Sequence, residues 1–238
     1  MKIFLDTAEI EEIKTAARWG VLDGVTTNPS LYAKVGGSYD AILQEICKIT
    51  PGPVSAEVIS DDVEGMLEEG RHFAKLAPNI VVKVAMSENG LEAISRFADE
   101  GIKTNCTLIF STNQGLLAAK AGASIISPFV GRLDDINQDG MTVITELVTI
   151  VENYDLDSEV LAASIRHPLH VTQAALAGSH IATVPFKILQ QMVHHPLTDK
   201  GIVTFRQDWD NARKAAAEKN SQPAVAGETA ASGSGRHN

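Results

Sequence analysis

The sequence predicts an α/β protein built as a closed (β/α)8 barrel, a TIM barrel, with an additional C-terminal helix. Eight short segments rich in β-branched residues alternate with helical segments of about 10 to 15 residues, the pattern of right-handed parallel βαβ units. The length of 238 residues suits one such barrel, which takes roughly 250 residues. Polar residues also recur at the same end of successive predicted strands.

Each predicted strand is a short apolar run that stops at a polar residue, a glycine or a proline. The dipeptide Asn28-Pro29 is expected to end regular structure after the second strand, because the residue before proline avoids the helical region. The fourth strand is almost wholly apolar, as expected for a strand buried on both faces. The eight strands are predicted at 2–5, 24–27, 54–58, 79–86, 105–110, 124–127, 160–164 and 181–184.

Each predicted helix begins at a capping residue or a proline and carries apolar residues at helical spacing. Thr7 and Ser38 are expected N-caps, and Gly101 and Gly122 are expected stops. Pro185 suits the first turn of the helix that follows the last strand. The helices are predicted at 7–18, 38–48, 61–76, 87–99, 112–121 and 140–153, with two more beginning near 168 and 185.

Residues 198–219 predict a further helix with Ile202, Phe205, Trp209 and Ala212 on one side. This apolar stripe could pack across the barrel base or against another subunit, and both alternatives stay open. We expect one domain over 1–219, followed by a disordered, non-functional tail at 220–238 that is rich in Ser, Gly, Ala and Pro.

Charge and composition limit the partners and the compartment. The net charge of −10 and the pI near 5.1 argue against binding to nucleic acid or to anionic membranes. No apolar stretch reaches the roughly 20 residues of a membrane span, and the N-terminus does not resemble a signal peptide. Cys47 and Cys106 form neither a disulfide framework nor a metal motif, which favours a reducing cytoplasm.

Lys83 lies inside the apolar fourth strand, Val81-Val82-Lys83-Val84. Burying an ammonium costs several kcal/mol unless the group is paired or loses its proton. A neutral amine attacks carbonyl carbon, so Lys83 is a candidate Schiff-base residue. Alternatively, its stem packs inward while its head reaches solvent.

Polar residues stand at the ends of strands one to seven, where barrel proteins of this kind carry their sites. Lys83 with the carboxylates of Asp6 and Glu57 would supply a covalent amine and proton-transfer groups, the minimum for Schiff-base cleavage of a carbon–carbon bond. Asp6 could instead cap the first helix. The polar residues at the strand ends are Asp6, Thr26, Asn28, Glu57, Lys83, Asn105, Thr107, Ser127, Arg132, Ser164 and Arg166.

Arg132 and Arg166, with Ser164, suggest a local phosphate clamp on an otherwise acidic protein. Alternatively, Arg166 and His167 only form the entry to the helix at Pro168. Hydroxyl groups of a polyol would be bound by Asn28, Asn105 and Ser127.

These motifs give the chain a resemblance to the small, single-barrel subfamily of transaldolases that also includes fructose-6-phosphate aldolase. The resemblance extends from the start of the chain to about Trp209. The matching motifs lie at 4–7, 24–30, 81–84, 105–108, 127–132 and 163–166.

The resemblance implies transfer of a dihydroxyacetone unit from sedoheptulose 7-phosphate or fructose 6-phosphate to glyceraldehyde 3-phosphate or erythrose 4-phosphate, in the non-oxidative pentose phosphate pathway. Lys83 resembles the Schiff-base lysine, and Glu57 an acid/base group acting through a water held also by Thr107. Asp6 resembles the group that takes the proton from the donor's C4 hydroxyl. The resemblance further implies substrate contacts from Thr26, Asn28, Asn105, Ser127, Phe129, Arg132, Ser164 and Arg166.

No metal or organic cofactor is implied, and the expected partners are sugar phosphates. The resemblance also implies a ring-based homo-oligomer, with a decamer as one candidate, in which the C-terminal helix lies at the subunit contact. Ala85 departs from the proline usual in the family, so the exit from the fourth strand is expected to be less rigid.

Phe129 and Glu57 favour transfer over simple cleavage, because sequences similar to fructose-6-phosphate aldolase have tyrosine and glutamine at these places. A phenylalanine keeps the reactive centre dry until an aldehyde acceptor arrives. Two alternatives remain: a Schiff-base lyase of the fructose-6-phosphate aldolase type, and a barrel that binds sugar phosphates without turnover.

Overall fold

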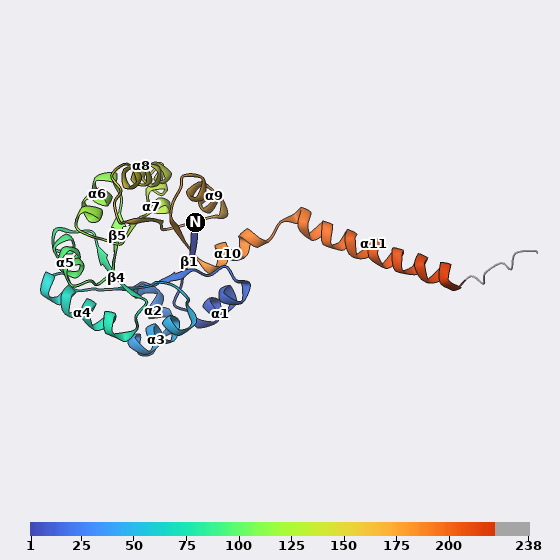
Figure 1. Ribbon diagram of the computed structural model, residues 1–238, viewed down its shortest axis with the longest axis horizontal. Coiled ribbons are helices and arrows are strands. Elements are labelled where there is room, and N and C mark those ends of the chain that lie inside the picture. The colour runs from blue at the N-terminus through green and yellow to red at the C-terminus, as the bar shows by residue number, and fades with distance from the viewer. Residues whose placement is uncertain (222–238) are drawn as a thin grey trace, which may run out of the picture. The chain divides into compact units, whose positions relative to one another are not determined.

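The structure is a computed structural model that describes residues 1–221 (Figure 1). It contains two compact units, one covering residues 1–192 and a second that begins at Val193. The expectation of one domain over 1–219 stays a prediction. No helix among the described residues combines the length and the hydropathy that a membrane crossing requires.

The first unit is a closed barrel of eight parallel strands in chain order, which confirms the predicted fold class (Figure 1). β8 pairs with β1 in parallel and closes the sheet. The strands are β1 (Lys2–Asp6), β2 (Gly24–Thr26), β3 (Val54–Glu57), β4 (Ile80–Ala85), β5 (Thr104–Ile109), β6 (Ile125–Pro128), β7 (Glu159–Ala162) and β8 (Ile181–Val184).

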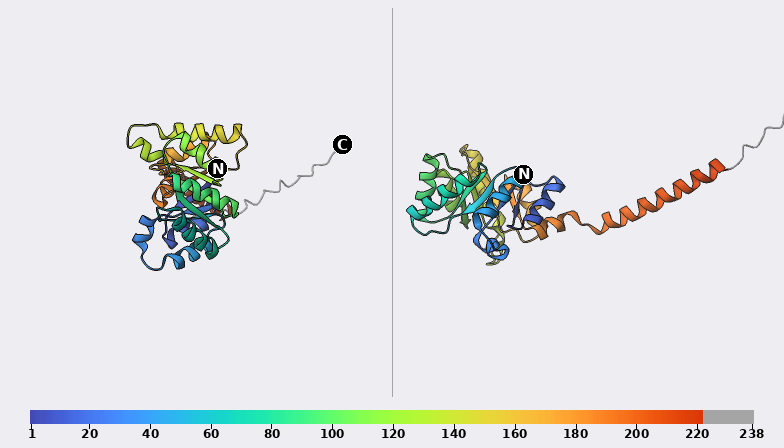
Figure 2. Two further views of the ribbon diagram at one scale, coloured as in Figure 1. Left: turned by 90° about the vertical axis from the view of Figure 1, so that its left-hand side faces the viewer. Right: turned by 90° about the horizontal axis from the view of Figure 1, so that it is seen from below.

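Helices follow the strands and surround the barrel, as two further views show (Figure 2). Those expected from the sequence are α1 (Ile10–Trp19), α3 (Tyr39–Ile49), α4 (Val63–Leu76), α5 (Glu88–Asp99), α6 (Thr112–Lys120), α8 (Gly140–Asn153), α9 (Pro168–Leu176) and α10 (Phe186–Val193).

The start of the first helix was predicted wrongly. α1 begins at Ile10 with Glu9 at its N-cap, three residues after the predicted Thr7. Thr7 Oγ1 instead accepts the backbone N–H of Glu9 at 3.1 Å and donates to Glu12 at 2.6 Å, so its hydroxyl orders the turn before the helix. Ser38 does occupy the N-cap of α3, but its side chain makes no capping hydrogen bond.

Two short helices were not predicted, α2 (Pro29–Val35) and α7 (Val130–Asp134). Asn28 caps α2, because its side chain accepts from the backbone N–H of Leu31 at 3.1 Å, and Pro29 takes the first helical position. An Asn-Pro pair ends one element and suits the start of a helix equally well. α7 places Arg132 on a helix where the sequence indicated a loop.

The barrel interior is apolar toward the N-terminal ends of the strands, and the site lies in the next layer, toward their C-terminal ends. Phe4, Val81, Ile125, Leu161 and Ile181 form one buried cluster of inward-facing residues. Phe4 lies opposite Gly24 in the β1–β2 register, and a Cβ on Gly24 would stand 2.5 Å from the Phe4 ring. Because side chains alternate along a strand, the residues two positions further on face the same interior one layer higher.

The second unit contains one long helix, α11 (Pro196–Ser221). Its large apolar side chains are exposed, among them Ile202, Phe205 and Trp209. Of the tail predicted at 220–238, only the first two residues are described, as the end of α11, and the rest lies outside the described residues.

Candidate active site

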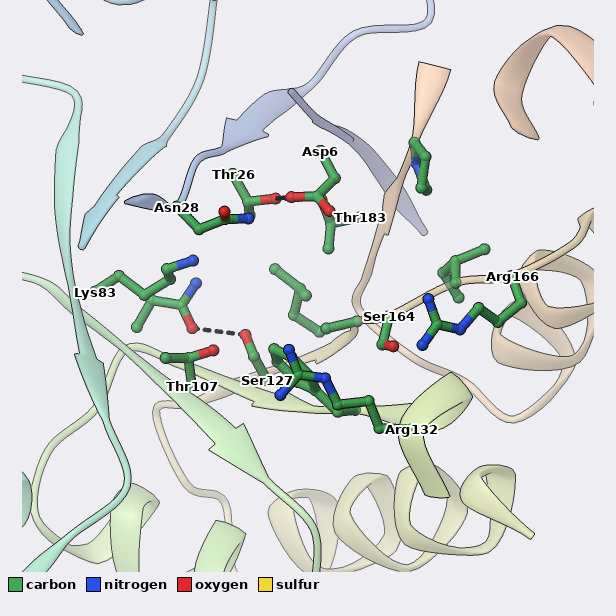
Figure 3. Close-up of a pocket in the computed structure, with 16 residues that line it drawn as sticks. Asp6, Thr26, Asn28, Lys83, Thr107, Ser127, Arg132, Ser164, Arg166 and Thr183 are labelled. Atoms are coloured by element: carbon green, nitrogen blue, oxygen red, sulfur yellow. Dashed lines mark hydrogen bonds between the residues drawn. The ribbon is translucent and has the colours of Figure 1, made fainter. Parts of the chain in front are cut away.

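A cavity of about 220 Å³ opens at the C-terminal ends of the strands (Figure 3). Every site residue predicted from the sequence lines it except Glu57. The predicted residues that the structure brings together here are Asp6, Thr26, Asn28, Lys83, Asn105, Thr107, Ser127, Phe129, Arg132, Ser164 and Arg166.

Lys83 and Glu57 form a buried ion pair across two strands. The β3–β4 register sets them opposite each other, and Lys83 Nζ lies 3.1 Å from Glu57 Oε2. Their side chains are 7% and 15% exposed, so the alternative in which the Lys83 head reaches solvent is wrong. An ammonium at this depth requires such a partner, because unpaired it would carry the full cost of desolvation.

Glu57 does not line the cavity and is connected to it by the ion pair with Lys83. Its side chain lines a neighbouring apolar hollow, together with Tyr32, Tyr39 and Phe73. Tyr39 also donates its hydroxyl to the Glu57 backbone oxygen at 3.5 Å. Glu57 therefore stands behind the amine, where it can exchange a proton with Nζ without contacting the open part of the cavity.

Asp6 faces the cavity from the end of β1. Its Oδ1 accepts from Thr26 Oγ1 at 2.9 Å, and the Thr26 and Thr183 hydroxyls lie 2.5 Å apart. Asp6 does not cap α1, whose N-cap is Glu9. Burial raises the pKa of the Asp6 carboxyl, and the opposing effects of the Lys83 charge and the Thr26 hydrogen bond are smaller.

Asn105 and Ser127 are fixed by hydrogen bonds inside the barrel. Asn105 Nδ2 donates to Ser55 Oγ at 3.1 Å, and Ser127 Oγ donates to Asn105 Oδ1 at 2.6 Å. All three residues are buried. This chain sets the orientation of the Asn105 amide beside Lys83, its partner in the β4–β5 register.

Thr107 is the last inward side chain of β5 and is 2% exposed. The β5–β6 register shifts around it, between Cys106 and Ile109. Leu108 sits in the shifted stretch with φ at 58°, a conformation that costs a non-glycine residue about 1–2 kcal/mol. Backbone outliers of this kind cluster at functional sites.

The cationic end of the cavity is built from α7 and the loop after β7. Figure 3 shows Arg132, Ser164 and Arg166 on the side away from Lys83. The Arg132 guanidinium lies 5.0 Å from the centroid of the Phe129 ring, in a cation–π contact, and Arg166 pairs with Asp135 at 2.9 Å. Two guanidinium groups at one mouth can hold an anion on this acidic protein.

Sequence reasoning missed two polar residues that belong to the site. Ser55 anchors the Asn105 amide, and Thr183 lines the cavity beside Thr26. Both could have been found from the sequence, because residues two positions apart on a strand face the same side of the sheet. Ser55 precedes Glu57 by two positions, and Thr183 follows Ile181 by two. Within residues 1–221, no three histidine, cysteine or acidic side chains gather closely enough to hold a metal ion.

The fold and the site together define a (β/α)8 barrel with a lysine–carboxylate pair and an anion-binding mouth around one cavity. The chain belongs to the family described as "Transaldolase/Fructose-6-phosphate aldolase". The model of that family matches residues 3–233. The resemblance read from the motifs is thereby confirmed.

Relatives named "Probable transaldolase" match about nine tenths of the chain. A "Probable transaldolase" from Herpetosiphon aurantiacus is 61% identical over 216 residues, which are 91% of this chain and 98% of the relative. A "Probable transaldolase" from Thermoanaerobacter sp. is 59% identical over 212 residues, 89% of this chain and 98% of the relative. A "Probable transaldolase" from Heliobacterium modesticaldum is 59% identical over 213 residues, which are 90% of this chain and 99% of the relative.

Replacing Asp6 by asparagine is expected to stabilise the fold at pH 7. The raised pKa means that the native state binds a proton at Asp6 more readily than the unfolded state does. Stability therefore falls as pH rises through the window between the two pKa values and stays lower above it. The stability gain of Asp6→Asn, measured by thermal unfolding, should shrink as the pH falls through the raised pKa of Asp6, and it should be gone below the ordinary carboxyl pKa of about 4.

Asp157→Asn serves as the matched control, because Asp157 is exposed. It should leave both the unfolding midpoint and its pH dependence unchanged. An Asp6→Asn protein that is less stable than the wild type at pH 7 would show that ionised Asp6 stabilises the barrel.

Proposed function

We propose that this protein is a transaldolase that moves a dihydroxyacetone unit between sugar phosphates through a Schiff base on Lys83. The observation that carries the proposal is the buried Lys83–Glu57 contact of 3.1 Å at the floor of a cavity with two arginines at its mouth. The relatives named "Probable transaldolase" support the same activity. A barrel that only bound sugar phosphates would have no use for an amine beside two carboxylates.

Formation of the Schiff base needs Lys83 as a free amine. Glu57 Oε2 is placed to take the proton from Nζ, and the neutral amine then attacks the C2 carbonyl of the ketose phosphate. Loss of water gives a protonated imine bonded to Lys83. We infer that Glu57 exchanges the later protons of imine formation, those that pass to and from the substrate, through a water shared with Thr107, whose side chain lines the cavity.

Cleavage of the C3–C4 bond needs a base at the C4 hydroxyl. Asp6 faces the cavity across from Lys83, and its carboxylate takes that proton as the C4 carbonyl forms and the aldose phosphate departs. The electron pair of the broken bond passes into the imine and leaves an enamine on Lys83. The same steps in reverse join the three-carbon unit to an acceptor aldehyde.

Substrate binding divides between the two ends of the cavity. We assign the phosphate group to Arg132, Ser164 and Arg166, which lie together away from Lys83. The donor's hydroxyl groups would contact the polar residues around the amine, Thr26, Asn28, Asn105 and Ser127. Proposed donors are sedoheptulose 7-phosphate and fructose 6-phosphate, with glyceraldehyde 3-phosphate and erythrose 4-phosphate as acceptors.

We further propose that the reaction belongs to the non-oxidative pentose phosphate pathway, runs in the cytoplasm and uses no organic cofactor. Two free, buried cysteines, Cys47 and Cys106, suit a reducing compartment. The protein is proposed to form a ring-based homo-oligomer, with a decamer as one candidate, in which α11 contacts a neighbouring copy. The exposed apolar residues of α11 support this, because a face of that size is normally buried.

Lys83→Ala is expected to lower kcat for transfer from fructose 6-phosphate to erythrose 4-phosphate by at least about 10⁴-fold, because no other residue that the structure places around the cavity carries an amine. A coupled assay for glyceraldehyde 3-phosphate, run with and without acceptor, measures this. Borohydride with fructose 6-phosphate should add mass to the wild type and not to the variant.

Lys187→Ala is the matched control, because Lys187 is exposed on α10. Its transfer rate in the coupled assay and its mass increase with borohydride should equal those of the wild type. Trapping that persists in Lys83→Ala, or steady turnover without acceptor in the wild type, would count against the proposal, and the latter would favour the lyase alternative.

Phe129→Tyr is expected to raise the release of free dihydroxyacetone severalfold relative to transfer. A phenol beside the enamine can hydrogen-bond the water that protonates it, whereas the Phe129 ring keeps that part of the cavity apolar. The measurement is the ratio of acceptor-independent to acceptor-dependent product. Phe110→Tyr is the control, since Phe110 packs 5.7 Å from the Phe129 ring without lining the cavity, and an equal change in both variants would contradict the assignment.

A chain that ends at His195, and so lacks α11, is expected to lose the oligomer and to run at the mass of a single chain. The exposed Phe205 and Trp209 side chains would no longer be available for a contact between copies. Light scattering gives the mass, and a chain that ends at Ser221 should keep the full-length value. An unchanged mass for the shorter chain would exclude α11 from the contact.

A further inference from the structure

The two arginines at the mouth of the cavity lie on separate segments. Arg132 is on α7, and Arg166 is in the loop between β7 and α9. Capturing one anion with both guanidinium groups requires that the loop and α7 keep a fixed distance. Half of the Arg166 side chain is exposed, so packing of that side chain alone does not hold it.

Close backbone contacts join the two segments beneath the arginines. Val130 N donates to Ala163 O at 3.0 Å, and Gly131 N donates to Ser164 O at 3.1 Å. A Cβ on Gly131 would lie 2.2 Å from Ser164 O, so only glycine allows this approach. These bonds stop at Ser164, two residues short of Arg166.

His170, in the first turn of α9, extends the connection between α7 and the loop as far as Arg166. The His170 side chain is 5% exposed, and its Nδ1 accepts the backbone N–H of Arg166 at 3.3 Å. On the other side of the ring, Nε2 lies 2.8 Å from Asp134 Oδ2. Asp134 Oδ1 in turn accepts from Gly140 N at 3.0 Å, at the start of α8.

This arrangement assigns the tautomer of His170. Because Nδ1 accepts a hydrogen bond, it carries no proton, and Nε2–H donates to the Asp134 carboxylate. Burial and the neighbouring His167 lower the pKa of His170, while Asp134 opposes them. The charged or titratable groups that face His170 are Asp134 from α7 and Arg166 and His167 from the loop. The ring is therefore neutral at pH 7, as the acceptor role requires.

We propose that His170, oriented by Asp134, is a positioning residue that holds the Arg166 backbone in place against α7, so that Arg132 and Arg166 act on one anion. The bound group is a phosphate, and only the assignment of that phosphate to a sugar substrate rests on the proposed transaldolase function. His170 itself does not line the cavity and acts through Arg166.

Two conservative variants separate the two hydrogen bonds of the ring. In His170→Asn the side-chain oxygen can take the place of Nδ1 and accept from Arg166, but the contact with Asp134 is lost. In His170→Gln the amide can reach Asp134, but no acceptor remains near Arg166 N. We expect His170→Gln to weaken binding of inorganic phosphate about tenfold, because a buried N–H loses its partner. His170→Asn should weaken binding less, because the Arg166 N–H keeps an acceptor and only the contact with Asp134 is lost.

Isothermal titration with inorganic phosphate measures the affinity, and steady-state kinetics give a second readout. His170→Gln should raise KM for fructose 6-phosphate with little change in kcat, and should leave kcat/KM for unphosphorylated fructose unchanged. His72→Phe is the matched control, because His72 forms a similar pair with Asp40 on the exposed surface, 2.8 Å apart. It should leave all of these values unchanged.

The pH dependence gives an independent test. A proton on Nδ1 removes the acceptor and places a positive charge beside Arg166 and His167. Phosphate affinity of the wild type should therefore fall, relative to His170→Asn, as the pH drops through the pKa of His170. Changes in the ionisation of phosphate affect both proteins equally and cancel in the ratio.

Phosphate affinity that is unchanged in His170→Gln, equal losses in the Asn and Gln variants, or an equal fall in kcat/KM for fructose and fructose 6-phosphate would each overturn the proposal. Absence of phosphate binding by the wild type would do the same. If the wild type binds phosphate with the expected pattern but turns over no sugar phosphate, the positioning role stands and the transaldolase function fails.

Discussion

The contact between Lys83 and Glu57 is the constraint on which the rest of the site depends. A lysine inside a parallel barrel is tolerated only because a carboxylate from the adjacent strand lies 3.1 Å from its amine. Removing one member of such a buried pair costs about 3–5 kcal/mol, since the other charge is left without compensation. The apolar layer around Phe4, one step below, supplies the packing that allows the layer above it to be polar.

The cations of this cavity fall into two kinds that suit two tasks. Lys83 is buried beside Glu57 Oε2, which can take the proton from Nζ so that the amine acts as a nucleophile. Arg132 and Arg166 lie at the exposed mouth, and a guanidinium keeps its charge at any physiological pH, as the capture of an anion requires. Binding energy from an anion held at the mouth can thus orient a reacting carbon at the amine.

The predictions from sequence succeeded where a local pattern carried the information. Strands were found from β-branched runs, and α5 was found from Ser87, whose side chain accepts from Gly90 N at 2.9 Å as a cap should. They failed for α2 and α7, which are too short to show an apolar period. Thr7 misled the placement of α1, because a threonine hydroxyl stabilises a turn as readily as a helix start.

The sequence by itself determined that this chain is a (β/α)8 barrel and that polar residues end its strands, because both follow from short-range periodicity. Only the tertiary structure decided which groups meet: that Glu57 stands behind Lys83, that Ser55 and Thr183 complete the polar layer, and that His170 joins the Arg166 loop to Asp134. Such contacts depend on strand register and on barrel closure, which bring together residues far apart in the chain. No local pattern encodes those distances.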